Sequence, residues 1–254
     1  MEPSRVSNVV GFCAPNLPWN ATQEQDPTYL LLGGARPKQE QIMSTPFLSP
    51  MELDKVATQL QWNSTVKDRM ADRYLAVITS VEFGGQTFRF TSKTGTANMD
   101  TGGGVLIGVP ENVASAYYKQ MESRARSLNM STAFLVREIS PNITQQTATY
   151  YAYPVQAYLH PALVARTVFP AMTITFRGGA KVTVNAEDMM SMMSGYYSSV
   201  VESMANPFLT SIPTAFWPSQ PFFRGRYTGF DRKLNALLMT DSLSCRKAKF
   251  IEPM

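Results

Sequence analysis

The chain has 254 residues, of which 17% are charged and 44% are hydrophobic, and its net charge is +4. This length suits one large domain or two small ones, and the hydrophobic content is enough for a packed core. His160 is the single histidine, and Cys13 and Cys245 are the only cysteines. A Ser-His-Asp catalytic site or a histidine-based metal site therefore has little support, and we expect no metal and no cofactor.

The two cysteines lie far apart in the sequence and match no metal-ligand spacing. They can form a disulfide only if the two ends of the chain meet, so we expect a reduced pair, in a reducing compartment or an assembled particle. The first residues show no basic stretch followed by an apolar run, so no signal peptide is expected. No segment has the ~18 consecutive apolar residues of a membrane-spanning helix, so no membrane span is expected.

Residues 1–50 are predicted to form an extended N-terminal arm. They contain seven of the 17 prolines, and proline lacks the amide donor that regular elements need. Unlike a disordered tail, this segment is rich in large apolar side chains. Such an arm should lie across another surface, either on its own domain or on a neighbouring subunit. The residues expected to make these contacts are Phe12, Trp19, Tyr29, Leu31 and Phe47.

Residues 51–206 are predicted to form an α+β core domain with antiparallel β-hairpins packed against helices. A capping box at Ser49 and Glu52 predicts a helix from residue 50. The segments 75–83 and 86–91 flank Gly84-Gly85 and predict a hairpin. Further expected elements are a second short helix carrying Val66 and Met70, a strand at 105–109, a helix over 110–128, and strands at 133–139 and 147–153.

The second half of this domain is predicted to repeat part of the same order. The segments 172–177 and 180–184 flank Gly178-Gly179 and predict another hairpin. Asn185 is a typical helix cap, and an apolar stripe at helical spacing predicts a helix that ends at Asn206-Pro207. We therefore expect a degenerate ββα duplication, with half-repeats at 75–139 and 172–206, the alternative being a chance match of short strings. The stripe consists of Met189, Met193, Tyr196, Val200 and Met204.

Residues 207–254 are predicted to be an irregular segment rich in proline and aromatic residues, with one short helix over 232–240 capped by Asp231. Residues 221–254 hold seven basic and three acidic residues, so this part carries the whole net charge of +4. A basic and aromatic cluster of this kind attracts acidic surfaces or nucleic acids, although a solvated tail is the alternative. The candidate contact residues are Arg224, Arg226, Arg232, Lys233, Arg246, Lys247 and Lys249.

Two segments resemble known families. Ser92-Lys93-Thr94-Gly95 resembles the Lys-Thr-Gly signature of penicillin-binding proteins and serine β-lactamases, and Ser64–Lys67 matches their Ser-x-x-Lys pattern. The two lysines are only 26 residues apart, too close for the helical domain that this family places between the motifs, so no acyl-transfer site is predicted. The strand–helix–strand over 105–139 resembles the small linker domain of phycobilisomes, but lacks the glycine pair usual before the last strand.

These observations favour a non-enzymatic function. The low charge density, the apolar arm and the many apolar helix positions are typical of a building block of a large protein particle, such as a virion or coat-like shell, whose partners are other protein subunits. One alternative is an accessory or linker subunit of a hetero-complex of the phycobilisome type. Another is a nucleic-acid-binding protein that uses the basic C-terminal segment.

Overall fold

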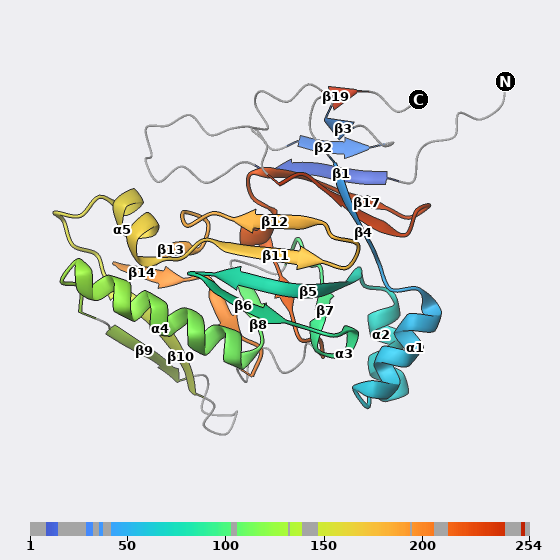
Figure 1. Cartoon of the computed structure of the whole chain (residues 1–254), viewed down its shortest axis with the longest axis horizontal. Helices are drawn as coiled ribbons and strands as arrows, with labels where there is room; N and C mark the ends of the chain where they lie inside the picture. Colours follow the sequence, from blue (N-terminus) through green and yellow to red (C-terminus); the bar gives the residue numbers. More distant parts are fainter. Residues whose placement is uncertain are drawn as a thin grey trace.

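The computed structural model describes residues 9–14, 29–32, 36–37, 42–102, 106–131, 133–138, 147–193, 195–205, 213–241 and 250–251. Within these residues the chain consists of helices packed on several mostly antiparallel sheets (Figure 1). The predicted α+β class is confirmed.

Several helices begin at a side-chain cap. Ser49 Oγ accepts a hydrogen bond from the amide of Glu52, and the Glu52 carboxylate accepts one from the amide of Ser49, which completes the capping box. His160 Nδ1 accepts a hydrogen bond from the amide of Ala162 at 3.2 Å, so the single histidine caps a helix. The helices in the described residues are Pro50–Gln59 (α1), Ser64–Ala71 (α2), Ser92–Gly95 (α3), Glu111–Ser127 (α4), Pro161–Val168 (α5) and Gln220–Phe223 (α6).

A central sheet contains both predicted hairpins in the order β12-β11-β5-β6, with β7 paired to β5. Gly84 and Gly85 turn the first hairpin with φ values of 52° and 79°, and Gly178 and Gly179 turn the second with 90° and 89°. Glycine is required there because other residues rarely adopt positive φ. The strands are Leu75–Phe83 (β5), Gln86–Arg89 (β6), Thr96–Asn98 (β7), Met172–Phe176 (β11) and Lys181–Val184 (β12).

Helix α4 packs on the core through two buried tyrosines. The Tyr117 hydroxyl donates to the carbonyl of Pro170 at 2.9 Å, and the Tyr118 hydroxyl donates to that of Val201 at 2.7 Å. Two further sheets, ordered β13-β14-β10-β9 and β15-β8-β16, complete this part of the molecule. Their strands are Ile107–Val109 (β8), Ala133–Glu138 (β9), Thr147–Pro154 (β10), Met190–Met193 (β13), Tyr196–Ser199 (β14), Val201–Ser203 (β15) and Trp217–Pro218 (β16).

The arm and the C-terminal segment meet in one five-stranded sheet, here called the terminal sheet, ordered β2-β1-β17-β18-β4 (Figure 1). Phe47 of the arm and Phe230 of the C-terminal segment belong to the same buried cluster as Ile78 of β5, so the core is continuous through all three parts. The strands are Val9–Ala14 (β1), Tyr29–Leu32 (β2), Met43–Pro46 (β4), Arg226–Asp231 (β17) and Ala236–Met239 (β18), and Arg36–Pro37 (β3) pairs separately with Phe250–Ile251 (β19).

Two predicted helices are wrong. After Asn185 the chain makes one turn, in which the amides of Asp188 and Met189 donate to the Asn185 carbonyl, and then continues as β13, β14 and β15. Asp231 does accept hydrogen bonds from the amides of Lys233 and Leu234, but the segment turns back into β18. In the described part of the second half, α4 has no counterpart, so the element order adds no support to the duplication, which stays a prediction.

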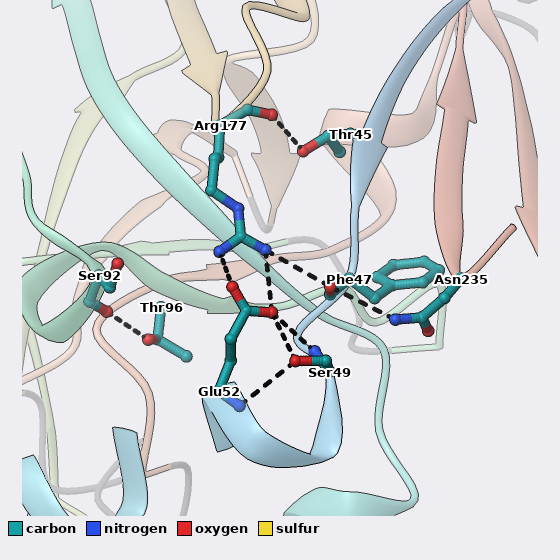
Figure 2. A network of polar contacts seen from close by, with 8 residues as sticks. All are labelled: Thr45, Phe47, Ser49, Glu52, Ser92, Thr96, Arg177 and Asn235. Atoms are coloured by element: carbon teal, nitrogen blue, oxygen red, sulfur yellow. Dashed lines mark hydrogen bonds and ion pairs between the residues drawn. The ribbon is translucent and has the colours of Figure 1, made fainter. Parts of the chain in front are cut away.

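A polar network joins α1, the β11–β12 turn and the terminal sheet (Figure 2). Arg177 forms an ion pair with Glu52, and its carbonyl accepts a hydrogen bond from Thr45 Oγ1 at 2.8 Å. The Ser49 amide, and after it the Arg177 guanidinium, lower the pKa of Glu52. Asn235 Nδ2 donates to the Phe47 carbonyl at 3.4 Å. The network therefore fixes the end of β4 against the central sheet.

Candidate assembly surface

The terminal sheet is built around β17, in which all six residues are buried. Strand β1 pairs antiparallel with one edge of β17, and β18 pairs antiparallel with the other. The centre of the sheet is therefore fixed from both sides. The outer strands, β2 and β4, are positioned by this centre.

Tyr227 fixes the register of β1 on β17 by lying over two glycines. Gly11 and Gly229 are directly opposed in the two strands. A Cβ atom on Gly11 would lie 2.8 Å from Tyr227 Cε2, and one on Gly229 would lie 2.6 Å from the Tyr227 hydroxyl oxygen. The ring thus occupies the space that side chains at these two positions would need. Tyr227 is fully buried, so this packing belongs to the interior.

Arg226 is a buried cation at the start of β17, with 1% of its surface exposed. Its Nη2 donates to the carbonyl of Thr183 at 2.7 Å, and its Nη1 donates to the carbonyls of Thr240 and Asp241. The guanidinium also lies 5.6 Å from the centre of the Phe222 ring. Burial lowers the pKa of Arg226 to about 10, so the group remains charged at neutral pH. The hydrogen bond from the Arg226 guanidinium to the Thr183 carbonyl links β17 to β12.

Asp188 is a buried carboxyl group on the turn between β12 and β13, with 3% of its surface exposed. Burial raises the pKa of Asp188 to about 6. Arg224 and Arg226 attract the carboxylate and oppose this rise, whereas Glu187 adds to it. Desolvation therefore outweighs the attraction of the two arginines.

An apolar group lies uncovered at the outer side of the terminal sheet. Val10 is 48% exposed, Leu30 68% and Leu32 64%. Val10 is directly opposed to Leu32, and Phe12 to Leu30, so all four side chains point to the same face. Covering each exposed side chain would contribute about 1–2 kcal/mol to a complex. Val10, Leu30 and Leu32 are called the β2 edge patch below.

The β2 edge patch continues a face that is buried further in. Phe12 lies 6.3 Å from Phe230 in a stacked arrangement and 5.7 Å from Phe223 edge-on, measured between ring centres. Phe12 therefore packs against the core, and β2 extends beyond it. The patch is the exposed outer part of the sheet face whose inner part packs against the core.

A second group of exposed apolar side chains lies near α5 and consists of Val155, Tyr158, Leu163 and Met192. Hydrogen bonds join these segments, since Val155 donates to the Gly195 carbonyl and the Tyr197 hydroxyl donates to that of Leu159. This group is spread over a loop, a helix and a strand. The β2 edge patch lies on two directly paired strands and is the better-defined surface.

The predicted arm contacts lie mainly on the chain itself. Phe47 is 5% exposed and packs against Tyr74 and Phe230. Phe12 is half-buried, as are Tyr29 and Leu31 in β2. Trp19 lies outside the described residues. The described part of the arm is thus an integral part of the terminal sheet.

Four of the seven predicted basic residues are described, and these four do not form one exposed cluster. Arg226 is buried, so its guanidinium is inaccessible to an external phosphate. Arg224 is half-buried, whereas Arg232 and Lys233 are exposed in the turn between β17 and β18. The remaining three, Arg246, Lys247 and Lys249, lie outside the described residues.

Cys13 is buried in β1 and is disulfide-bonded, so the expectation of a reduced pair is wrong for this residue. Cys245, the other cysteine of the chain, lies outside the described residues. Strand β1 pairs with β17, which brings the two ends of the sequence together. That was the condition under which the sequence allowed a disulfide.

Val10, Leu30 and Leu32 were not among the predicted contact residues. The run Tyr29–Leu32, bounded by Pro27 and Gly33, is typical of a short strand and could have indicated β2. Which of its side chains stay exposed depends on the pairing of β2 with β1, and no local pattern specifies that pairing.

No protein-family model matches the chain, and no curated protein matches it. Among the described helices, none is long and apolar enough to cross a bilayer. In the same part of the chain, no three histidine, cysteine or acidic side chains are grouped so that they could hold a metal ion.

Proposed function

We propose that the protein is a non-enzymatic structural subunit of a large protein particle, such as a virion or coat-like shell, and contacts neighbouring subunits through the β2 edge patch. The observation that carries this proposal is the exposure of Leu30 and Leu32 side by side on an outer strand. Contiguous exposed apolar groups on soluble proteins commonly mark interaction surfaces.

The composition supports the same proposal. Only 17% of the residues are charged, below the ~25% typical of globular domains. A surface with few charges suits a protein that is largely covered by partners. The patch is also held in place before any partner arrives, because Phe12 anchors β1 in the core and β1 pairs with β2. A preorganised contact loses less conformational entropy on binding.

The test is the mass of the full-length chain in solution, measured by light scattering over a range of concentrations. We expect a mass above the 28.2 kDa of one chain that rises with concentration. A mass of 28.2 kDa at every concentration would contradict self-assembly and favour an accessory subunit of another complex. The arm must stay in place, because removing residues 1–48 would delete β1, β2 and β4 and expose Phe230.

A further inference from the structure

Strand β2 is the outermost strand of the terminal sheet. Strand β1 pairs with one of its edges, and no described strand pairs with the other. The short strand β3, which follows β2 in the sequence, lies against β17 instead. The outer edge of β2 is therefore a site where another strand can add to the sheet through main-chain hydrogen bonds.

The chemistry of this edge restricts which strand can add. Residues 27–35 contain no charged side chain. Natural proteins usually protect an edge strand with lysine, proline, a bulge or a covering segment. A charged partner strand would bury its charges against Leu30 and Leu32, whereas a second copy of this chain presents the same uncharged residues. The neutral, apolar edge is complementary to itself.

We propose that a second copy of this chain pairs antiparallel with β2 across a two-fold axis that is perpendicular to the sheet and passes midway between the Leu31 residues of the two copies. This inference rests on the proposed function and specifies the neighbour and the contact. Leu30 then opposes Leu32 of the partner subunit, and Leu31 opposes Leu31 of the partner subunit. The two terminal sheets become one continuous sheet.

The symmetry follows from the face on which the leucines lie. A two-fold axis perpendicular to the sheet keeps the two faces distinct, so the exposed leucines of both copies lie on the same side. Directly opposed side chains in antiparallel strands have Cβ atoms about 4.5–5.5 Å apart, which is within contact distance. The leucines of each copy therefore contact those of the other along the joined edge, and the apolar row continues from Val10 of one copy into the other.

Charge introduced at the edge should break the contact. Leu30→Lys should weaken self-association at least tenfold in sedimentation equilibrium, because the ammonium group would be placed opposite Leu32 of the partner subunit. The matched control is Leu234→Lys in the turn between β17 and β18, since Leu30 is 68% exposed and Leu234 is 67% exposed. The control should change the dissociation constant less than twofold. Circular dichroism of both variants checks the fold.

Salt separates this contact from an electrostatic one. Each copy carries a net charge of +4, so two copies repel at long range. Raising the salt concentration from about 50 mM to about 500 mM screens this repulsion and should leave the association unchanged or make it tighter. An association that weakens tenfold over this range would indicate ionic contacts and would overturn the inference.

A cross-link tests the position of the axis. Leu31→Cys should form a disulfide-linked dimer under mild oxidation, because Cα atoms opposed in antiparallel strands lie within the range of a disulfide. Met51→Cys on α1 is the control, since Met51 is also well exposed, at 65%. Hydrogen exchange of the unmodified chain adds a measurement that needs no variant. The amides of residues 30–32 should exchange more slowly when the chain is associated.

The outcomes distinguish the two proposals. Weakening by Leu30→Lys together with cross-linking of Leu31→Cys supports the contact. A chain that assembles while Leu30→Lys behaves like Leu234→Lys and Leu31→Cys does not cross-link overturns the β2 contact and the role of the β2 edge patch. Only the part of the proposed function that makes the protein a self-assembling subunit then stands. A chain that stays monomeric at every concentration overturns self-assembly itself. If Leu30→Lys fails to fold, the exchange rates of residues 30–32 in the unmodified chain decide.

Discussion

Replacing Asp188 by asparagine should stabilise the protein at neutral pH. Burial raises the pKa of this carboxyl group from 3.8 to about 6, so the folded protein holds the proton more tightly than the unfolded chain does. One pKa unit corresponds to about 1.4 kcal/mol, so burying the carboxylate lowers the free energy of unfolding by about 3 kcal/mol once the group is ionised. Asparagine has a similar shape and carries no charge to bury.

The pH dependence gives the sign of the effect. Between pH 3.8 and about pH 6 the folded state binds more protons than the unfolded state at this group, so the unfolding free energy falls as the pH rises. Asp188→Asn lacks this dependence, and its advantage over the unmodified chain should grow by about 1.4 kcal/mol between roughly pH 5 and pH 7.5. Arg226 keeps its carbonyl partners in the variant, so it is not left unpaired.

Urea denaturation at the two pH values measures this difference. Asp72→Asn makes the same substitution at an exposed residue at the end of α2 and serves as the control. The reasoning is refuted if Asp188→Asn is less stable than the unmodified chain at pH 7.5, or if the difference between them does not vary with pH. The first result would mean that the attraction of Arg224 and Arg226 outweighs the cost of desolvation, and the second that the two effects cancel.

Two further substitutions test the packing that holds the terminal sheet. Gly11→Ala should destabilise the fold by about 1–3 kcal/mol in urea denaturation, because its Cβ would lie 2.8 Å from Tyr227 Cε2. Gly102→Ala should have little effect, since its nearest contact would be 3.6 Å from Asp100 Oδ1, and equal effects would contradict the argument. Arg177→Met should cost about 1–2 kcal/mol, because it removes the ion pair to Glu52 and the bond to the Phe47 carbonyl. Arg166→Met removes the ion pair between Arg166 and Glu187, in which the Arg166 side chain is 73% exposed, so it should change the melting temperature little. A larger loss of stability from Arg166→Met than from Arg177→Met would contradict this comparison.

The elements that the sequence predicts correctly are those specified by neighbouring residues. The capping box at Ser49 and Glu52 closes within one turn, and it begins α1 as expected. The Gly-Gly pairs at 84–85 and 178–179 take the positive φ values that hairpin turns require. Helix α4 buries Tyr117 and Met121 along one face, as its periodicity indicates. In each case the information lies within a few residues of the element.

The wrong helices show where local patterns become ambiguous. The Asp231 side chain accepts the hydrogen bonds expected of a helix cap, and the Asn185 main-chain carbonyl accepts those of a first helical turn, but each segment ends after a single turn. A cap and a turn begin with the same bonds, so the following residues decide between them. Gly195, with a φ of 82°, reverses the chain between β13 and β14, and Asn235, with a φ of 49°, does so before β18. At these two residues the chain turns back, so the segments predicted as helices are strands on either side of a turn.

The candidate surface depends on contacts that no local pattern contains. Val10, Leu30 and Leu32 lie on one face only because β2 pairs with β1, and β1 is held only because it pairs with β17 near the other end of the sequence. Pairing of strands so far apart in the sequence has an entropic cost of loop closure that local structure does not offset. The packing of Tyr227 and Phe230 contributes to offsetting this cost. The β2 edge patch is thus presented by a chain in which β17 is already in place. A chain that lacks β17 and β18 has no strand to hold β1, so the proposed contact between subunits requires the whole terminal sheet.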